Sequence, residues 1–505
     1  MIPYAVLVAV ALALRLVGLD DKPFHHDESQ DAYFSWIFFT RGEYEYDPLL
    51  HGPLRFYLTA AMYGLFGDSD FTARLAPALM GGAMVGLPYF LRDQLGRVGA
   101  FSAAVLLAVG PTYLYFSRFA REDIYFACLS LAMLVVVFRL LKGSDPLTSR
   151  RRLPALLGAL LALSFATKET TFITCFVAGT FFLGVLAWKR ELLVEPIRSL
   201  GLDAWGWGLA AFAGVFTVLF TTFLTHSAGL WDGIYTGLEY WLGQHEVGRG
   251  GEPWFFYGVL LFAHEWPVLL LGGVGAVVAL RRPTLLRAFL IWAFAVSLVV
   301  YSWAGEKFAW LALHPLLPLL LLAGIGVQAI WEARRRWYGA LGLAVTAVAF
   351  AYVVSASWLV NARHSADPRE FLVTTQSSEE VKRIADRLVA EAARADRDGR
   401  AYRITVDSAA GATYPWAWYF RDLPVDYPNL GETDATPRRP DALILTQAAH
   451  DRVQLPGYTQ REFPFRVWWV RDYGAMSPGN WWRWFTRRDP WNPTGGMPEW
   501  LYLRR

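Results

Sequence analysis

Long apolar stretches recur along the first 360 residues of the chain. Each approaches the length that a helix needs to cross about 30 Å of hydrocarbon. They lie at 2–19, 74–91, 98–116, 123–141, 153–167, 170–188, 206–225, 255–280, 286–303, 308–331 and 337–359. This pattern predicts a polytopic α-helical membrane protein with about eleven transmembrane helices.

A shorter apolar segment at 54–66 lies inside the first polar loop. It has 13 residues, follows His51-Gly52-Pro53 and precedes Gly67-Asp68. A spanning helix needs about 20 apolar residues, whereas this length is typical of an interfacial or re-entrant helix. We therefore expect the segment not to span, which leaves one long first loop at 20–73.

The distribution of Lys and Arg sets the expected orientation. With a cytoplasmic N-terminus and a non-spanning 54–66, the inner connections carry 16 Lys and Arg and the short outer connections carry five. This excess obeys the positive-inside rule, and a spanning 54–66 would reverse it. The start Met1–Leu19 lacks a basic leader and a small-residue cleavage site, so we expect a retained first helix. The prediction is a multi-pass cell-membrane protein with an extracytoplasmic C-terminal part.

Composition changes near residue 360. Residues 361–505 contain 40 charged side chains in 145 positions, about 28%, against 51 in the first 360, about 14%. Glu379–Arg397 is amphipathic with a helical period, and 403–406, 442–445 and 466–470 are typical of short strands. The sequence therefore predicts a transmembrane domain at 1–360 and a small soluble α/β domain at 361–505.

Overall composition agrees with a membrane protein. Apolar residues make up 55% and charged residues 18%, while soluble domains carry about 25% charged residues. A formal net charge of +3 gives no reason to expect a nucleic-acid partner. Cys128 and Cys175 lie in apolar runs, where they are expected to be small buried hydrophobic side chains rather than a disulfide framework.

Most of the polar residues that stand out belong to loops on the predicted outer side. Ionisable groups at membrane depth cost about 2.5–3.5 kcal/mol each. Their gathering at one face therefore indicates a shared polar cavity. The members are His26, Asp27, Glu28, His51, Arg118, Arg121, Glu122, Asp123, Lys168, Glu169, Glu306 and Lys307.

Carboxylates with basic neighbours suit group transfer from a phosphate. A carboxylate can accept the proton of an attacking group, and Arg and Lys can hold a phosphate as it leaves. A lipid-linked phosphate donor suits this place, since its tail can lie between helices. The same residues also allow a purely structural interpretation, in which they are helix caps, ion pairs and interfacial polar groups.

Four motifs, in order and all on the predicted outer side, resemble a known superfamily. They are His26-Asp27-Glu28-Ser29, Phe119-Ala120-Arg121-Glu122-Asp123, Thr167-Lys168-Glu169 and Glu306-Lys307-Phe308-Ala309-Trp310-Leu311. Over about 1–330 the chain resembles the GT-C glycosyltransferases, in particular the protein O-mannosyltransferase and aminoarabinose-transferase branch. More narrowly, it is similar to the flippase-activity-associated family of archaeal and bacterial N-glycosylation.

The resemblance implies a GT-C fold and an inverting glycosyltransferase, a hexosyl- or pentosyltransferase. The enzyme would move a monosaccharide from a polyprenyl-phosphate donor to a lipid, glycan or protein acceptor. It implies that Asp27 is the catalytic base and that Asp123 orients the reactants, and Glu28, beside Asp27, is expected to be catalytic as well. Arg118 and Arg121 match basic residues near the donor phosphate, with help expected from Lys168 or Lys307. The remaining acids and histidines, His26, His51, Glu122, Glu169 and Glu306, are expected to support the cavity.

Several alternatives stay open. No cofactor is predicted, but a divalent metal at His26, Asp27 and the second-loop acids is left open, because hard cations prefer carboxylates. A non-enzymatic flippase, or flippase-associated protein, for lipid-linked sugars is the second function, although mostly apolar helix centres disfavour a carrier. A non-catalytic assembly protein is the third.

Overall fold

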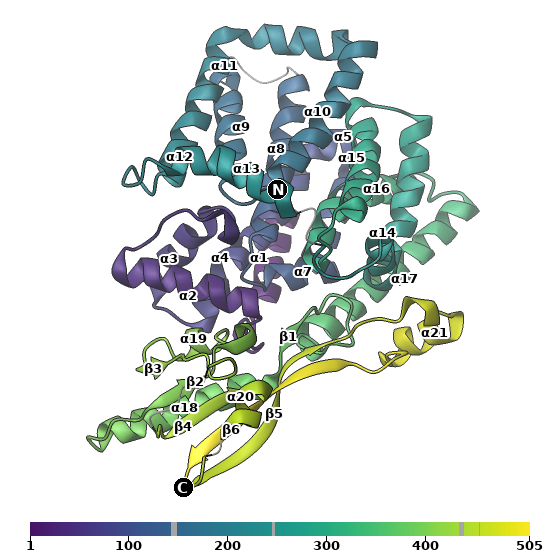
Figure 1. The fold of residues 1–505 in the computed structure, drawn as a ribbon. Helices are drawn as coiled ribbons and strands as arrows, with labels where there is room; N and C mark the ends of the chain where they lie inside the picture. Colours follow the sequence, from purple (N-terminus) through teal and green to yellow (C-terminus); the bar gives the residue numbers. More distant parts are fainter. Residues whose placement is uncertain (143–148, 245–247, 434–438, 454) are drawn as a thin grey trace. The chain divides into compact units, whose positions relative to one another are not determined.

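The computed structural model describes residues 1–142, 149–244, 248–433, 439–453 and 455–505 (Figure 1). These residues divide into two compact units. The first comprises Met1–Val17 and Arg41–Arg363, and the second comprises Gly18–Thr40 and His364–Arg505. The second unit resumes close to the compositional boundary at 360. It also takes in Gly18–Thr40, which composition had placed in the transmembrane domain.

The first unit is helical, with a helix at each of the eleven expected spans. Its main helices are α1 (Ile2–Leu16), α3 (Leu54–Phe66), α4 (Asp70–Ala83), α6 (Arg97–Val109), α7 (Pro111–Ser117), α8 (Asp123–Lys142), α9 (Ser149–Phe165), α10 (Thr171–Trp188), α11 (Glu191–Phe220), α14 (Phe256–Arg281), α15 (Leu285–Trp303), α16 (Leu313–Glu332) and α17 (Trp337–Trp358). Shorter helices are η1 (Pro48–Leu50), η2 (Met84–Leu91), α5 (Arg92–Leu95), α12 (Gly229–Trp231), α13 (Gly237–Gln244) and η4 (Ala309–Ala312).

Helix length and composition identify fewer spans than the eleven expected. In the described part of the chain, seven helices are long and apolar enough to cross a membrane: α8, α10, α11, α14, α15, α16 with η4, and α17 with its last turn. The bent pair α6 and α7, which meet at 53°, would make an eighth, and α1 is shorter. The chain is a multi-pass membrane protein, and the count of eleven stays a prediction.

The short helix α3 has the bounds expected of a non-spanning segment, Leu54–Phe66. Its first residue, Leu54, is buried with Leu129 of α8, Ala162 of α9 and Phe216 of α11. Packing against three long helices places the start of α3, and the loop before it, beside the start of α8.

Helix α16, taken with η4 before it, is the most buried of these seven helices in the described part of the chain, with 94% of its most apolar 18 residues inside the protein. Small residues allow its neighbours to come close, as is common between membrane helices. A Cβ atom on Gly275 of α14 would lie 1.8 Å from the Leu322 carbonyl oxygen, and one on Gly99 of α6 would lie 2.6 Å from the Gly324 carbonyl oxygen. These close approaches hold the second half of α16 against both helices, and His314 lies in the first turn of the same helix.

The second unit contains a six-stranded sheet in the order β1-β5-β6-β4-β2-β3 (Figure 1). The strands are β1 (Gln376–Ser377), β2 (Ile404–Val406), β3 (Val425–Asp426), β4 (Ala442–Thr446), β5 (Tyr458–Trp468) and β6 (Gly495–Arg504). β2 pairs parallel with β3 and β4, and the other pairs are antiparallel. The expected α/β fold of this region is confirmed.

Helix α18 (Glu379–Arg397) buries its apolar face against this sheet. Ile384 and Leu388 share a core with Ile404, Ile444 and further strand residues. The period of 3.6 in this segment therefore predicted both the helix and its buried face.

Residues 18–40 belong with this sheet for a physical reason. The backbone N–H of Phe24 donates to the Tyr419 hydroxyl at 2.9 Å, and the Gln376 side chain donates to the Pro23 carbonyl at 3.0 Å. The Phe24 ring also packs against Trp418 at 5.5 Å between centroids. Helix α2 (His26–Arg41) follows directly, so the start of this helix is held by residues of the C-terminal region.

Candidate active site

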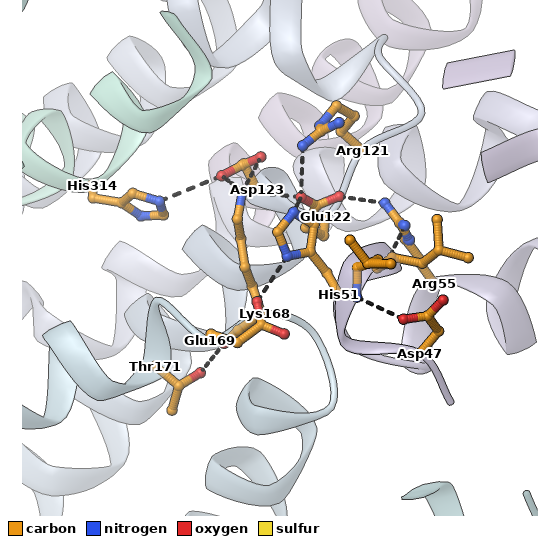
Figure 2. Close-up of polar contacts among 12 residues, drawn as sticks. Asp47, His51, Arg55, Arg121, Glu122, Asp123, Lys168, Glu169, Thr171 and His314 are labelled. Atoms are coloured by element: carbon orange, nitrogen blue, oxygen red, sulfur yellow. Dashed lines mark hydrogen bonds and ion pairs between the residues drawn. The ribbon is translucent and has the colours of Figure 1, made fainter. Parts of the chain in front are cut away.

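Glu122 is the centre of a buried polar network in the first unit (Figure 2). Its carboxylate lies 2.6 Å from Arg55 Nη1, 2.9 Å from Lys168 Nζ and 3.1 Å from Arg121 Nη2. His51 Nε2 lies 3.5 Å from the same carboxylate. One fully buried acid therefore has three cations and an imidazole around it, brought together from three separate segments of the chain.

Asp123, the first residue of α8, adds a second buried acid. Lys168 Nζ donates to both Asp123 oxygens, at 3.0 and 3.2 Å. His314 Nε2 lies 3.5 Å from Asp123 Oδ1. Lys168 therefore bridges the two adjacent acids, and α16 reaches the pair through His314. We call Glu122, Asp123, Lys168, Arg121, Arg55, His51, Glu169 and His314 the Glu122 network.

The His51 loop docks directly onto the turn that carries Lys168. The Gly52 N–H donates to the Thr167 carbonyl at 3.2 Å, and the Leu54 N–H donates to the Ala166 carbonyl at 2.8 Å. A Cβ atom on Gly52 would lie 2.1 Å from the Ala166 carbonyl oxygen, so only glycine allows this approach. His51 Nδ1 then lies 2.8 Å from Glu169 Oε2.

Asp47, before His51 in the chain, and Arg55, after it, both stabilise this loop (Figure 2). The Asp47 carboxylate accepts the Leu49 N–H at 2.9 Å and so caps η1. Arg55 Nη2 donates to the Leu50 carbonyl while Nη1 binds Glu122. One guanidinium thus joins the end of η1 to the centre of the network.

The charges of the network shift the pKa values of Glu122 and Lys168 in opposite directions. Burial favours the neutral form of Glu122, but the charges of Arg121, Lys168 and Arg55 outweigh it and hold the pKa of Glu122 well below its usual value. Burial likewise opposes the charge of Lys168, but Asp123 and Glu122 raise its pKa. Both groups are therefore ionised at neutral pH, as buried ion pairs require.

An apolar cavity of about 240 Å³ meets the polar network. Its walls are mostly apolar side chains of α8, α10, α15 and α16, including Phe126, Val177 and Leu317. One of its lining residues, His314, is a member of the network and contacts Asp123. Another, Thr171, touches the network, since its hydroxyl donates to the Lys168 carbonyl at 2.8 Å. The arrangement joins an apolar space between helices to a group of buried charges.

The other predicted phosphate-binding residues of the first unit have structural partners. Arg118 Nη1 donates to the carbonyls of Leu14 and Arg15 at 3.0 Å each and of Val17 at 2.7 Å, so it caps the C-terminal end of α1. Lys307 Nζ donates to the Ala304 carbonyl at 2.6 Å, and burial lowers its pKa. Glu306 is partly exposed, and its charge adds to the raised pKa of Lys168.

The first-loop motif lies in the second unit. Asp27 is partly exposed, and its N–H donates to His25 Nδ1 at 3.0 Å. Glu28 is fully buried, and its carboxylate accepts the His25 N–H at 3.1 Å, which is a helix-capping contact at the start of α2. Arg466 of β5 donates to His26 Nδ1 at 2.9 Å and to the carbonyls of Gly411 at 2.7 Å and Tyr414 at 3.2 Å.

The sequence patterns did not predict four residues of the site, Arg55, His314, Trp310 and Arg466. Arg55 is a lone cation in the apolar segment 54–66, and His314 is a lone ionisable group in an apolar span, which are signals of a functional or paired residue. Trp310 belongs to the fourth motif, and the Arg121 guanidinium lies 4.6 Å from its ring centroid. No local pattern marks Arg466, because its partners are about 50 and 440 residues away.

The donor atoms of the network do not favour a metal. In the ranges that the structure describes, no three His, Cys, Asp or Glu side chains are arranged to hold a metal ion. Within the network, Lys168 and the two arginines are already in contact with the carboxylates of Glu122 and Asp123. We therefore derive no step through a metal.

Residues 50–219 match the family described as dolichyl-phosphate-mannose-protein mannosyltransferase. The matched range contains every member of the Glu122 network except His314. A curated relative is undecaprenyl phosphate-alpha-4-amino-4-deoxy-L-arabinose arabinosyl transferase 1 of Pseudomonas fluorescens (strain Pf0-1), 26% identical over 288 residues. The match covers 53% of this chain and 46% of the relative, so the chain spans about half the length of the relative that it matches.

Solved structures resemble the chain over more of its length. The crystal structure of ArnT from Cupriavidus metallidurans bound to undecaprenyl phosphate has a TM-score of 0.62 and 16% sequence identity, over 88% of this chain and 93% of that chain. The chain has the GT-C fold. The same GT-C fold explains its likeness to the apo oligosaccharyltransferase of Archaeoglobus fulgidus, with a TM-score of 0.55 and 13% identity over 84% of this chain and 64% of that one.

These findings confirm the GT-C fold that the resemblance implied, and the family match over 50–219 and the curated relative are both similar to the mannosyltransferase and aminoarabinose-transferase branch. They also confirm the expected fold class, helical and polytopic with a C-terminal sheet domain. The narrower likeness to the flippase-activity-associated family stays a prediction.

Proposed function

We propose that this GT-C protein is an inverting glycosyltransferase. It would move a monosaccharide from a polyprenyl-phosphate donor to an acceptor at the outer face of the membrane. The observation that carries the proposal is the buried Glu122 network at the side of an apolar cavity between membrane helices. The cavity offers space of the kind that an isoprenoid tail needs, and the network supplies cations for the adjoining phosphate.

The relatives support the same donor class. One is an undecaprenyl phosphate-alpha-4-amino-4-deoxy-L-arabinose arabinosyl transferase, and another was solved bound to undecaprenyl phosphate. We infer a polyprenyl phosphate as the lipid part of the donor of this chain. A lipid, glycan or protein is the acceptor class, and the sugar itself is set by neither the fold nor the network.

The proposed transfer is a single displacement. Asp27 takes the proton of the acceptor group, the acceptor atom bonds to the anomeric carbon, and the bond from that carbon to the phosphate oxygen breaks. The phosphate leaves on the lipid with the electron pair of that bond. Attack opposite the leaving group inverts the anomeric centre. General-base help of this kind contributes roughly 10²- to 10⁴-fold in rate.

Among the predicted phosphate ligands, Arg121 and Lys168 have the strongest structural case. Arg121 is stacked on Trp310, which fixes its plane, and Lys168 lies between the two acids. Because Lys168 has two carboxylate partners, it orients Asp123 and meets the phosphate only if it gives up part of that contact. We assign Lys307 an auxiliary role and Arg118 the capping role described above.

Asp27→Asn provides the first test. We expect transfer to fall by at least about 10²-fold, because the variant lacks the base, while affinity for undecaprenyl phosphate stays unchanged. The measurement uses purified full-length protein in nanodiscs, a fluorescent short-chain polyprenyl phosphate for binding, and release of polyprenyl phosphate from polyprenyl-phosphate hexoses and pentoses for transfer.

Two controls make this test decisive. Arg151→Gln breaks an exposed ion pair with Asp203 at 2.6 Å and should change neither binding nor transfer. Arg121→Gln should weaken polyprenyl phosphate binding. Transfer at the wild-type rate by Asp27→Asn would reject the base, and wild-type donor affinity in Arg121→Gln would reject the phosphate site.

A non-enzymatic flippase is the second candidate, and one observation favours it. Glu265 and His264 are fully buried inside the span α14, where a carrier needs polar groups, and the helix is kinked at Glu265. The same experiment separates the two functions. Polyprenyl-phosphate sugar that binds without release of polyprenyl phosphate, but crosses a vesicle membrane, would favour the flippase.

A further inference from the structure

A second polar cavity lies at the other end of α8. Its volume is about 280 Å³, and its lining residues are Tyr89, Phe90, Arg92, Asp93, Gln94, Phe138, Arg139 and Lys142. They come from η2, α5 and the last turn of α8. No step of the proposed transfer uses any of these residues.

The length of α8 separates this cavity from the Glu122 network. The helix has 20 residues, from Asp123 to Lys142, which at 1.5 Å per residue is about 30 Å, the thickness of the hydrocarbon core. Asp123 and Lys142 are therefore at opposite surfaces of the membrane. A phosphate held near Arg139 and Lys142 cannot be the one that leaves at the network.

The cavity has an excess of positive charge. Arg92, Arg139 and Lys142 face it together with a single carboxylate, Asp93, which gives a formal charge of +2 among the lining residues. Lys142 Nζ lies 3.0 Å from Asp93 Oδ2, with half or more of each side chain exposed, so the pair contributes little and yields readily to a stronger anion.

An aromatic ring orients the Arg92 guanidinium, and a second ring lies near Arg139. The Arg92 guanidinium lies 4.0 Å from the Tyr89 ring centroid, and Arg92 Nη1 donates to the Tyr89 carbonyl at 2.8 Å. The Arg139 guanidinium lies 6.0 Å from the Phe90 ring centroid. Stacked, planar guanidinium groups are suited to bidentate binding of phosphate oxygens.

We propose that this cavity binds the phosphate headgroup of an anionic phospholipid from the leaflet at that end of α8. A lipid fits better than a free phosphate because the cavity lies at the end of a membrane-spanning helix and has an exposed apolar wall, with Phe90 46% exposed. Basic pockets between membrane helices are suited to anionic headgroups. The site would anchor the end of α8 opposite to Glu122 and Asp123.

The test measures binding of fluorescent phosphatidylglycerol by the detergent-solubilised full-length protein, with phosphatidylcholine as the neutral lipid. The double variant Arg92→Gln/Arg139→Gln is expected to weaken phosphatidylglycerol binding by about tenfold or more, because two charge-assisted contacts are lost. The wild-type protein should bind phosphatidylcholine more weakly than phosphatidylglycerol. The double variant should bind phosphatidylcholine as the wild type does.

The matched control is Arg334→Gln/Arg335→Gln. These arginines lie in the exposed connection between α16 and α17, and Arg334 is also stacked on an aromatic ring, Trp331, at 4.6 Å. The control makes the same charge change outside the cavity, so phosphatidylglycerol binding should change by less than about twofold. Equal loss in the two double variants would overturn the site and leave only a general attraction to basic loops.

Soluble glycerol phosphate distinguishes the two sources of phosphate. We expect it to compete with phosphatidylglycerol only weakly, since it lacks the apolar part. Full competition at comparable concentration would overturn the lipid assignment in favour of a soluble phosphate. Thermal unfolding of each variant, measured without added lipid, shows whether the protein is folded. If Arg92→Gln/Arg139→Gln is unfolded, the single variant Lys142→Gln takes its place with the same expected direction, and no loss of binding there would reject the proposal.

Discussion

Glu122 has more charged partners than a helix-start ion pair needs. An exposed pair at a helix start contributes about 0–1 kcal/mol, whereas breaking a buried pair costs about 3–5 kcal/mol. Arg55, Arg121 and Lys168 all contact Glu122 in the interior. Such a site is retained at a high desolvation cost, which is typical of functional groups in membrane proteins.

Because the pKa of Glu122 is depressed, the free energy of unfolding depends on pH in the acidic range. Because the folded protein holds this pKa below its usual value of 4.5, the unfolded chain binds more protons between the two values. The stabilisation from Glu122 is therefore present above about pH 4.5 and is lost as pH falls toward the folded pKa. The raised pKa of Lys168 acts at the other end, since its stabilisation is lost only as pH rises above its usual 10.5.

We therefore expect the unfolding temperature of wild-type protein in detergent to fall below about pH 4.5. The variant Glu122→Gln should have a lower unfolding temperature at pH 7 and a weaker fall in acid, because it has no carboxylate to protonate. Thermal unfolding followed by tryptophan fluorescence between pH 3.5 and 8 measures both. An acid fall of equal size in the variant would mean that other carboxylates cause it.

At the scale of elements, the contact between the His51 loop and the Lys168 turn decides whether the network assembles. Gly52 permits that contact, because a side chain there would overlap the Ala166 carbonyl at 2.1 Å. The two segments lie more than 100 residues apart, one at the start of α3 and the other just after the end of α9. Backbone hydrogen bonds between them take the place of secondary structure.

Gly52→Ala should therefore separate the two segments and weaken binding of polyprenyl phosphate about tenfold, with a lower unfolding temperature. Gly179→Ala in α10 is the control, since its Cβ atom would meet nothing within 4 Å, and alanine is the better helix former. Wild-type donor affinity in Gly52→Ala would contradict the role assigned to this contact. Measurement of donor affinity alongside unfolding separates a local from a global effect.

Strand β5 offers a second test at this scale, within the second unit. Arg466 joins His26 to the carbonyls of Gly411 and Tyr414, so it is a positioning residue for the segment that carries Asp27. Arg461, on the same strand, makes an exposed pair with Glu380 at 2.6 Å.

We expect Arg466→Ala to lower kcat for transfer about tenfold or more with little change in the donor KM, because the base is misplaced and the donor phosphate site is intact. Arg461→Ala should leave both values unchanged. Arg466→Lys should restore only part of kcat, since a lysine cannot reach three acceptors with one planar group. A rise in donor KM with unchanged kcat would contradict the positioning role.

At the scale of the whole molecule, charge asymmetry sets the proposed topology. The excess of Lys and Arg in one set of connections predicts a cytoplasmic N-terminus and an extracytoplasmic C-terminal region. Alkaline phosphatase fused after Arg505 should be active, while a fluorescent protein fused there through the secretory route should stay dark. Activity of phosphatase fused after Arg92, in a predicted inner connection, would contradict this orientation.

Much of the fold was predictable because it depends on local hydropathy. Apolar length predicted a helix at every expected span, and the short segment 54–66 ends where its apolar run ends. The amphipathic period at 379–397 predicted α18 and its buried face. Strand β6 was not predicted. Residues 495–504 are extended because they pair with β4 and β5, which is a long-range contact and not a local pattern.

The candidate site was predictable in part. The motifs with Glu122-Asp123 and Lys168 were recognised from the order of charged residues, and the structure brings these three together. Arg55 and His314 join them only through packing of α3 and α16 on α8. Arg118 was expected near a phosphate, and it binds the free carbonyls at the end of α1.

The sequence by itself determined where apolar segments begin and end, and which loops carry the acids and cations, because both are properties of neighbouring residues. Only the tertiary structure decided which charges meet. Lys168 bridges Glu122 and Asp123 because two turns pack closely at Gly52, and residues 18–40 belong with the C-terminal sheet because Phe24 and Pro23 bind there. Such partners lie far apart in the chain, and a buried charge is stable only where folding supplies its counter-charge.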